Sequence, residues 1–585
     1  MSYFVSPEFA RVVVLGSITS LQMTWRRLVN ELVPTPYLDE VFHIPQVQAY
    51  WQGKWSQWDP KITTPPGLYV FSFLVNSTRD FFYHNFDPSI SEWRAINVFL
   101  LYLLIFALYI LAAVGRKTVN HHSVLQREFS IIVFPLLFFF SALYYTDLFS
   151  VFTVVVAHIF WSASTSATTG RRKALYQFLH LVTGLVSLSS RQTNIFWVAV
   201  YLGGLQVVES VKSNIGISKV HDPPISEAFF EDFPITSISI AQSAITMIPH
   251  LLLDLWPHLA LLASFAGFVV WNGGVVLGDK DNHIATVHLP QMLYIWPFIV
   301  FFSWPVLLPQ LCHLAEFRRP HQLPRLSVAL AFVAFMLAVV HFNTIVHPFT
   351  LADNRHYTFY VFRILLRPRH SWIKYAVVPI YLFCAFLVLG ALGGPTSSSS
   401  SSSLSSSSPA TRILYTHQDT VCVSFTLVWL LATSLSLVTA PLVEPRYFLI
   451  PWLMWRLAVP EYMPSPSISN SGPDDDALNV NAAPELAQDQ EKEKRKKKET
   501  TETGAIATAK KHDAVLSTGT AAAAAASTRH PQPSLFQRLL RTAASYSIWL
   551  EFLWYMLINL ATCYTFLHRG FEWPQEPGNV QRFMW

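Results

Sequence analysis

Residues 36–69 read PYLDEVFHIPQVQAYWQGKWSQWDPKITTPPGLY, and they follow directly after an apolar segment of membrane length, residues 9–29. The stretch is polar and rich in aromatic rings, whereas most of the 585-residue chain consists of hydrophobic segments. Charged residues beside a membrane commonly mark function, because they are costly to keep there. This contrast predicts a bundle of membrane helices with a candidate site in the first loop.

Composition supports the same fold class. The chain is 52% hydrophobic and only 13% charged, with a mean hydropathy of +0.34, whereas about a quarter of the residues in soluble domains are charged. Apolar stretches near the required length of roughly 20 residues recur along the chain, giving about 13 candidate spans. We therefore predict an all-α polytopic membrane protein with about 12–14 transmembrane helices. The first span lacks a basic region before it and a cleavage pattern after it, which predicts a retained signal-anchor.

Charge and cysteine content exclude several other classes. The net charge of +5 is small for this length, and the basic residues concentrate in a few loops, so no nucleic-acid partner is expected. The four cysteines are widely separated and form neither a disulfide framework nor a zinc-binding spacing. They are Cys312, Cys384, Cys422 and Cys563.

Basic loops predict the orientation of the spans, because Lys and Arg near span ends favour the cytosol. With a cytosolic N-terminus, residues 116–127, 171–173, 318–325 and 492–498 all fall on the cytosolic side. The opposite, luminal side then receives every chemically suggestive cluster. These clusters are the opening loop and residues 146–147, 191–194, 272–288, 347–363, 444–447 and 568–585.

Three regions are expected along the chain. Residues 1–462 form the multi-span module, which includes a serine-rich cytosolic connector at 394–412. Residues 463–540, rich in Asp, Glu, Lys, Ala and Ser, read as a disordered charged cytosolic loop. Residues 541–585 supply the last transmembrane helix and a luminal C-terminal tail.

The opening loop offers a candidate general base. Asp39 and His43 are four residues apart and would share one helical face with Gln46 and Tyr50, although Pro45 argues against an unbroken helix. A carboxylate there could accept a proton from an attacking hydroxyl group, which is the role of a general base. We therefore predict Asp39 as the catalytic residue.

The neighbouring residues are predicted to support the acceptor or the loop: Glu40, His43, Trp58 and Asp59. Glu40 would point about 100° away from Asp39 in a helix, so it orients the loop or binds acceptor hydroxyls. Alternatively, Asp39 and Glu40 cap a helix or solvate the loop, or they bind a cation together with His43. The tryptophans of the loop fit an interfacial aromatic belt or sugar stacking.

Cations elsewhere on the predicted luminal side are candidates for binding the phosphate of a donor. Arg355 and Arg446 offer a fixed fork of donors that fits phosphate oxygens, while Lys280 is a point charge and His356 lies beside Arg355. Such residues also commonly extend to lipid headgroups. Asn76 opens an Asn-Ser-Thr sequon and is the glycosylation candidate.

Eight ordered blocks of the sequence resemble one family, the dolichyl-phosphate-glucose dependent α-1,2-glucosyltransferases of the endoplasmic reticulum that complete lipid-linked oligosaccharide assembly. The blocks are YLDEVFHIPQVQAYW with QWDPKITTPPGLY, RAINVFL from Arg94, FFFSALYYTD ending at Asp147, RQTNIFWV from Arg191, NGGVVLGDKDNHIATVHLPQMLY from Asn272, HPFTLADNRHYTFY, EPRYFLIPWL and QRFMW.

The resemblance implies a GT-C type membrane fold with a luminal cleft for two lipid-linked substrates. The implied donor is dolichyl phosphate glucose, and the implied acceptor is the diglucosylated high-mannose oligosaccharide on dolichyl pyrophosphate. A β-linked donor and an α-linked product imply inversion by one direct displacement, with Asp39 as the base. Arg355, His356 or Arg446 would offset the charge of the departing phosphate. No cofactor is expected, and the reaction is expected to be independent of metal.

Three other functions remain as alternatives. Transport is disfavoured because transport sites place polar residues near mid-membrane in broken, repeated helices, whereas the polar clusters here lie at span ends. A membrane regulatory subunit that binds an ion channel would leave the luminal residues unexplained. Another dolichyl-phosphate-sugar transferase is the nearest competitor within the enzyme class.

Overall fold

A computed structural model describes most of the chain. The described residues are 7–115, 121–216, 219–278, 280, 286–315, 325–346, 348–394, 421–440, 442–460, 539–540, 542–544, 546–574 and 576–585. The serine-rich connector after residue 394, most of the predicted charged loop at 463–540, and the basic segments at 318–324 and 492–498 lie outside these residues.

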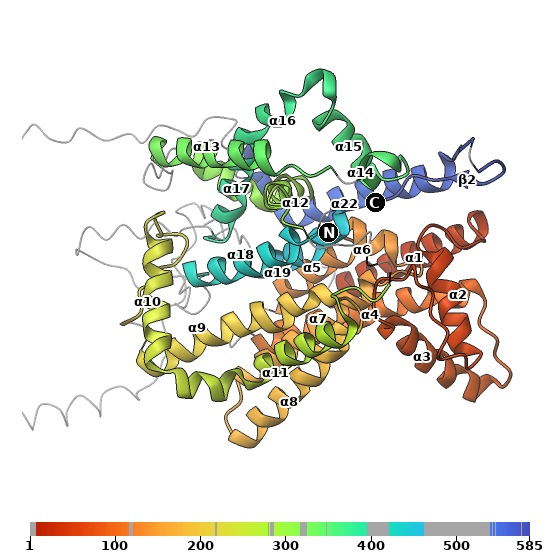
Figure 1. The fold of residues 1–585 in the computed structure, drawn as a ribbon, viewed down its shortest axis with the longest axis horizontal. Coiled ribbons are helices and arrows are strands. Elements are labelled where there is room, and N and C mark those ends of the chain that lie inside the picture. Colours follow the sequence, from red (N-terminus) through yellow and green to blue (C-terminus); the bar gives the residue numbers. More distant parts are fainter. Residues whose placement is uncertain are drawn as a thin grey trace, which may run out of the picture. The chain divides into compact units, whose positions relative to one another are not determined.

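Helices make up most of the described part of the chain (Figure 1). Its α-helices are α1 (Pro7–Leu32), α2 (Glu40–Trp51), α3 (Gly67–Tyr83), α4 (Ile90–Gly115), α5 (His121–Ile132), α6 (Pro135–Phe140), α7 (Asp147–Thr165), α8 (Gly170–Leu188), α9 (Leu202–Ile215), α10 (Asp232–Thr246), α11 (Ile248–Asn272), α12 (Gln291–Ala315), α13 (Leu326–Asn343), α14 (Pro348–Ala352), α15 (Tyr357–Leu365), α16 (Ile373–Ala376), α17 (Val378–Ala391), α18 (Val423–Val438), α19 (Leu449–Ala458) and α22 (Ser547–His568).

Short elements complete the fold. The 3-10 helices are η1 (Gln192–Asn194), η5 (Pro368–His370) and η6 (Pro445–Phe448), and η2 (Phe196–Tyr201) is a π-helix. The strands β1 (Phe571–Glu572) and β2 (Val580–Gln581) pair antiparallel, with Phe571 opposite Gln581.

Membrane-length helices dominate, which confirms an all-α polytopic membrane protein. Among the described residues, eight helical segments are long and apolar enough to cross a membrane. They are Ile90–Gly115, Asp147–Thr165, Gln192–Ile215, Ile248–Asn272, Gln291–Cys312, Leu326–Asn343, Ile373–Ala391 and Ser547–His568. The apolar helix α18 has only 16 residues, and α8 begins with three basic residues. The expected number of 12–14 crossings therefore stays a prediction.

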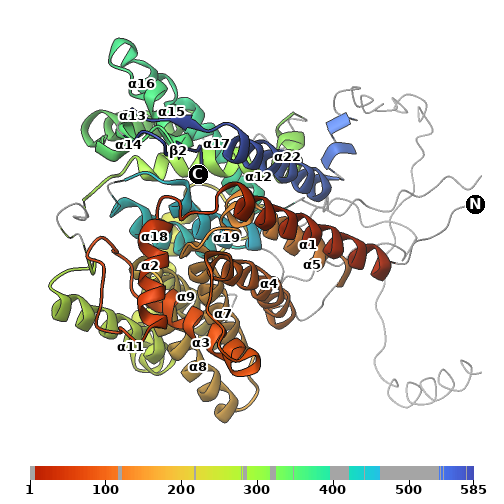
Figure 2. The same ribbon diagram turned by 90° about the vertical axis from the view of Figure 1, so that its right-hand side faces the viewer.

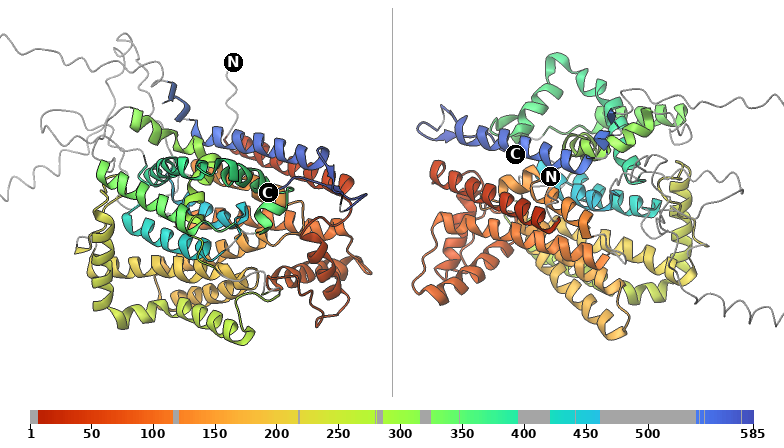
Figure 3. Two further views of the ribbon diagram at one scale, coloured as in Figure 1. Left: turned by 45° about the horizontal axis from the view of Figure 1, so that its top comes forward. Right: turned by 180° about the vertical axis from the view of Figure 1, so that it is seen from behind.

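Both neighbouring and distant helices of the sequence pack together. Helix α4 packs on α7 and α7 on α8, while α12 packs against α17 and α22. Helices α1 and α22 lie side by side (Figures 2 and 3) although they are at opposite ends of the sequence. The segment after α22 folds into the β1–β2 hairpin and then reaches residue 356, which forms an isolated parallel bridge with Met584.

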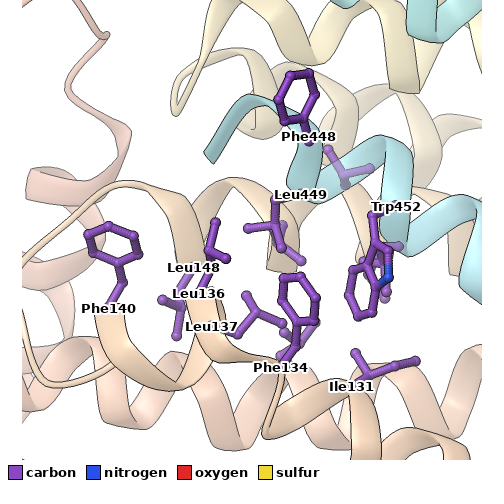
Figure 4. Packing of buried hydrophobic residues seen from close by; sticks show 14 of the residues in the cluster. Ile131, Phe134, Leu136, Leu137, Phe140, Leu148, Phe448, Leu449 and Trp452 are labelled. Carbon is purple, nitrogen blue, oxygen red and sulfur yellow. The ribbon is translucent and has the colours of Figure 1, made fainter. Parts of the chain in front are cut away.

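The hydrophobic core includes the short connection between α5 and α6. Phe134, in this connection, stacks on Trp452 of α19 with 3.7 Å between ring centroids (Figure 4). Tyr555 of α22 packs edge-on against the same Phe134 ring at 5.4 Å. Beside this aromatic cluster, Arg456 and Glu551 form a fully buried ion pair of 2.8 Å that joins α19 to α22.

The opening loop is fixed against the bundle at both of its ends. Helix α2 runs unbroken through Pro45, which corrects the expectation that this proline interrupts it. Burial of Ile44 and Val47 on either side offsets the backbone hydrogen bond that Pro45 lacks. At the far end, Gly67 begins α3 where its N–H donates to the Ser189 carbonyl at 2.7 Å. A Cβ at residue 67 would lie 2.5 Å from that carbonyl oxygen, so only glycine fits.

Candidate active site

Asp39 lies where the opening loop turns into α2. It occupies the N-cap position, yet its side chain makes no capping hydrogen bond. Instead, its carboxylate Oδ2 accepts from Arg446 Nη1 at 2.9 Å. The preceding Leu38 has a φ of 50°, a left-handed conformation that is strained for a residue with a Cβ. The Asp39 side chain remains 42% exposed, so an incoming hydroxyl can reach it.

Arg446 connects Asp39 to two further carboxylates. It lies in η6, and its Nε and Nη2 donate to Glu444 Oε2 at 3.0 and 2.7 Å. Its Nη1, which holds Asp39, is also 3.8 Å from Asp147 Oδ2. The guanidinium lies over the Tyr145 ring at 5.6 Å, and the side chain is only 12% exposed. A single, mostly buried arginine thus bonds two acids, Glu444 and Asp39, and lies near a third, Asp147.

Asp147 and Arg191 form a second ion pair behind Arg446. Asp147 is the first residue of α7 and is buried, and its Oδ1 lies 2.9 Å from Arg191 Nη2. Arg191 also donates to Thr146 Oγ1 from two nitrogens at 3.4 Å. The other oxygen of Asp147, Oδ2, is buried without a hydrogen-bond partner. Neither residue was assigned a role from the sequence, although an acid and a base at the ends of apolar segments on the same predicted face are a signal of function.

Electrostatics at the site favour an ionised Asp39 and a neutral His43. Partial burial is the largest influence on the Asp39 carboxyl and raises its pKa, but Arg446, His43 and His356 together outweigh it and hold the pKa below its ordinary value. Burial lowers the pKa of His43, and Asp39 only partly offsets this effect. At neutral pH the carboxylate of Asp39 is therefore available as a proton acceptor.

Glu40 has a different environment from its neighbour Asp39. It is fully buried, and both of its oxygens accept from Arg94 of α4, Oε1 from Nε at 2.9 Å and Oε2 from Nη2 at 2.6 Å. The backbone N–H groups of Tyr144 and Tyr37 donate to the same carboxylate. This arrangement supports the loop and leaves no surface for acceptor hydroxyls. Because the Glu40 carboxylate faces Arg94, it does not form a shared site with Asp39 and His43 that could bind a metal ion.

The other residues predicted to support the loop are His43, Trp58 and Asp59, and each contacts residues nearby in the loop or in α3. His43 Nδ1 lies 2.6 Å from the Tyr69 hydroxyl. Trp58 packs on Tyr69 with 6.2 Å between ring centroids, and its indole N–H is buried without a partner. Asp59 closes a turn in which its Oδ1 accepts from the Lys61 N–H at 2.9 Å. Tyr69 therefore links His43 and Trp58, whereas Asp59 shapes the loop.

Arg355 and His356 form a cluster with the C-terminal tail. Arg355 donates to both oxygens of Asp353 at 2.8 and 2.7 Å, and to Gln581 Oε1 at 3.0 Å. His356 Nδ1 lies 3.0 Å from the Trp585 carbonyl oxygen, and its Nε2 lies 3.7 Å from Asp353. His356 lowers the pKa of Asp39, so this cluster acts on Asp39 electrostatically.

The tail also reaches the opening loop. The hydroxyl of Tyr37 donates to the Arg582 carbonyl and accepts from the Arg582 N–H, both at 2.7 Å. The Arg582 guanidinium donates to the carbonyls of Phe566 and Leu567 at the end of α22 and of Leu32 at the end of α1. The sequence placed the tail on the luminal side but gave no indication that it holds the loop, because this contact joins residues 545 positions apart.

Two predicted residues lie away from the Arg446 cluster in the contacts that the structure describes. Lys280 is exposed and donates from Nζ to the carbonyl of Asn272, while the adjacent segment touches the loop because Gly278 packs on Pro60. Asn76 is fully buried within α3, where Arg79 donates to it at 3.3 Å. This burial argues against Asn76 as a glycosylation site, which needs an exposed asparagine.

Comparisons with known proteins identify the relationship. The model of the DIE2/ALG10 family matches residues 33–457. A protein of Aspergillus fumigatus named "Dol-P-Glc:Glc(2)Man(9)GlcNAc(2)-PP-Dol alpha-1,2-glucosyltransferase" is 37% identical over 96% of each chain. Proteins with the same name from Yarrowia lipolytica and Homo sapiens are 31% and 32% identical, covering 95% and 73% of this chain and 94% and 84% of their own. No solved structure matches.

The family match covers the opening loop, Asp147, Arg191 and Arg446 within one continuous range. The GT-C type fold class expected from the resemblance fits this family. The relatives are all named as glucosyltransferases, which confirms the prediction of a glycosyltransferase enzyme. The chain belongs to the DIE2/ALG10 family.

Proposed function

We propose that this protein transfers glucose from dolichyl phosphate glucose, in α-1,2 linkage, to the diglucosylated high-mannose oligosaccharide on dolichyl pyrophosphate. The names of relatives that span nearly the whole chain support this reaction. The observation that carries the mechanism is the half-exposed carboxylate of Asp39, which accepts a hydrogen bond from Arg446 at 2.9 Å.

The proposed step is one inverting displacement. The 2-hydroxyl oxygen of the terminal acceptor glucose attacks C1 of the donor glucose, and the bond between C1 and the phosphate oxygen breaks. The electron pair of that bond leaves on dolichyl phosphate, and the hydroxyl proton passes to Asp39. Asp39 suits this role because its low pKa keeps it ionised and its side chain is exposed.

The departing phosphate needs compensating charge. Arg446 contacts Asp39 directly, and both Arg446 and His356 lower the pKa of Asp39. Arg355 stands next to His356, and Lys280 follows the segment that packs on the loop at Pro60. We propose Arg446, Arg355 and His356 as donor-phosphate contacts, with arginine favoured by its fork of donors, while Lys280 stays a prediction because it lies away from the Arg446 cluster.

We place the reaction in the lumen of the endoplasmic reticulum. The relatives' lipid-linked substrate supports this location, and so does the gathering at one site of the loops predicted to be luminal. We also propose that the transfer needs no metal ion, and glucose transfer should therefore persist in the presence of a chelator such as EDTA.

Microsomes that lack the endogenous enzyme provide the test. They are supplied with dolichyl phosphate glucose and the diglucosylated acceptor, and triglucosylated product is measured for wild type, Asp39→Asn and Asp87→Asn at equal expression. Asp87 is an exposed carboxylate in the loop after α3 and serves as the matched control. We expect product from wild type and the control, and a loss of about a hundredfold or more from Asp39→Asn.

Each result discriminates between hypotheses. Full activity of Asp39→Asn would keep the reaction and remove Asp39 as the base. Product formed from dolichyl phosphate mannose, but not from the glucose donor, would favour another dolichyl-phosphate-sugar transferase. No product from folded wild type would overturn the proposed reaction and favour a regulatory subunit.

A further inference from the structure

Arg446 lies between two carboxylates but bonds to only one of them. Its Nη1 donates to Asp39 at 2.9 Å, while Asp147 Oδ2 lies 3.8 Å from the same nitrogen. The Nε side of the guanidinium is anchored independently on Glu444. Nη1 is therefore the nitrogen that lies between Asp39 and Asp147. A displacement of about 1 Å would bring this nitrogen within hydrogen-bond distance of Asp147 Oδ2.

Asp147 is arranged to receive that hydrogen bond. Its Oδ1 is held by Arg191, whereas its Oδ2 is buried and has no partner. An unsatisfied buried acceptor is unfavourable, so Asp147 Oδ2 would be stabilised by a donor that moves within reach. Here the unsatisfied oxygen faces the arginine that holds the proposed base.

Proton transfer would change the balance between the two acids. When Asp39 takes the acceptor proton it loses its negative charge, and with it most of its attraction for Arg446. Asp147 keeps its ion pair with Arg191, and its Oδ2 has no hydrogen-bond partner. The hydrogen bond that Asp39 gives up can thus be recovered at Asp147, which makes protonation of Asp39 easier than in a site where Arg446 had no second partner.

We propose that Arg446 is a shared cation whose Nη1 passes from Asp39 to Asp147 as Asp39 accepts the proton, and that Asp147 and Arg191 are positioning residues for this transfer. The inference rests on the proposed function and extends it to residues that contact neither substrate. It predicts that Asp147 acts on the chemical step through Arg446 and contributes little to substrate binding.

A double-mutant cycle on purified protein tests this coupling. The kcat and the KM for each substrate are measured for wild type, Asp147→Asn, Arg446→Lys and the double variant. Lysine keeps the charge but cannot hold Glu444 and a second acid with a fixed fork. We expect Asp147→Asn to lower kcat about tenfold with KM changed by less than about twofold. In the Arg446→Lys background the same change should lower kcat by less than about twofold.

Two further variants complete the design. Asp147→Glu keeps the carboxylate and should recover part of the lost kcat. Glu92→Gln breaks an ion pair with Arg79 away from the site, and its effect should be the same in both backgrounds. Equal losses from Asp147→Asn in both backgrounds, or an Asp147→Glu variant as slow as Asp147→Asn, would overturn the inference alone. A folded wild type without activity would overturn the proposed function and this inference together.

Discussion

At the scale of single residues, Asp39 and Glu40 show how adjacent carboxylates acquire opposite roles. Asp39 is half-exposed and shares Arg446 with other acids, whereas Glu40 is buried and fully bonded to Arg94 and two backbone N–H groups. The difference arises because successive residues of a helix point about 100° apart. One side chain consequently faces the cluster, and the other faces the core.

Replacing Arg446 by glutamine should raise the pH below which activity is lost. Burial is the largest influence on the pKa of Asp39 and raises it, and Arg446 is the largest of the influences that lower it. Without the charge of Arg446, burial would therefore raise the pKa of Asp39. The base works only when ionised, so activity should be lost at a higher pH than in wild type. The pH profile of kcat/KM measures this, because it reports groups of the free enzyme. A variant whose profile falls at the same pH as wild type would contradict the assignment of Asp39.

Glu40→Gln should damage folding more than catalysis. It would leave the guanidinium of Arg94 buried without an opposite charge, and removing one partner of a buried ion pair costs about 3–5 kcal/mol. Thermal unfolding in detergent should show a clearly lowered midpoint. A Glu40→Gln variant with a wild-type midpoint and a raised KM for the acceptor would instead support direct contact with the oligosaccharide.

At the scale of elements, close approach of α3 to the end of α8 sets the position of the opening loop. Gly67→Ala should destabilise the protein by about 1–3 kcal/mol, because the new Cβ meets the Ser189 carbonyl oxygen at 2.5 Å. The matched control is Gly16→Ala within α1, where no atom lies within 4 Å of the new Cβ, and which should be neutral or stabilising. Unfolding midpoints of the two variants provide the comparison. Equal midpoints would show that the junction tolerates a side chain.

The sequence predicted which segments form membrane helices better than it predicted helix interruptions or the number of spans. Long apolar segments gave the membrane helices because length and hydropathy are local properties. The interruption expected at Pro45 was wrong, since packing of Ile44 and Val47 keeps α2 continuous. The number of spans was hard to predict because short apolar helices such as α18 and charged starts such as that of α8 give no clear signal.

The candidate site was predicted in part. Asp39 and Arg446 were chosen from separate segments and lie in contact, and His356 lowers the pKa of Asp39. The role of Asp147 could not be predicted, because it depends on which oxygen Arg191 occupies and which faces Arg446. Such pairings follow from tertiary packing between η6, α7 and the segment before η1, and no spacing in the sequence encodes them.

At the scale of the whole molecule, Arg582 joins the two ends of the described chain. Its guanidinium caps the last carbonyls of α22 and α1, and its backbone holds Tyr37 in the opening loop. Arg582→Leu should cost roughly 1.5–3 kcal/mol for lost charge-assisted hydrogen bonds. It should also lower activity, since the loop that carries Asp39 loses an anchor. Unfolding and product formation are measured side by side, with Arg569→Leu, near the end of α22, as control. Full activity with unchanged stability would show that the tail is dispensable.

The contact between Tyr37 and Arg582 also bears on biogenesis. Synthesis proceeds from the N-terminus, so Tyr37 is made early and lacks its partner while the next 545 residues are made. During translation the opening loop therefore lacks its contact with the tail. We expect the loop to reach its final position only after the tail has been made, and fusions that displace residues 581–585 should be designed with this in mind.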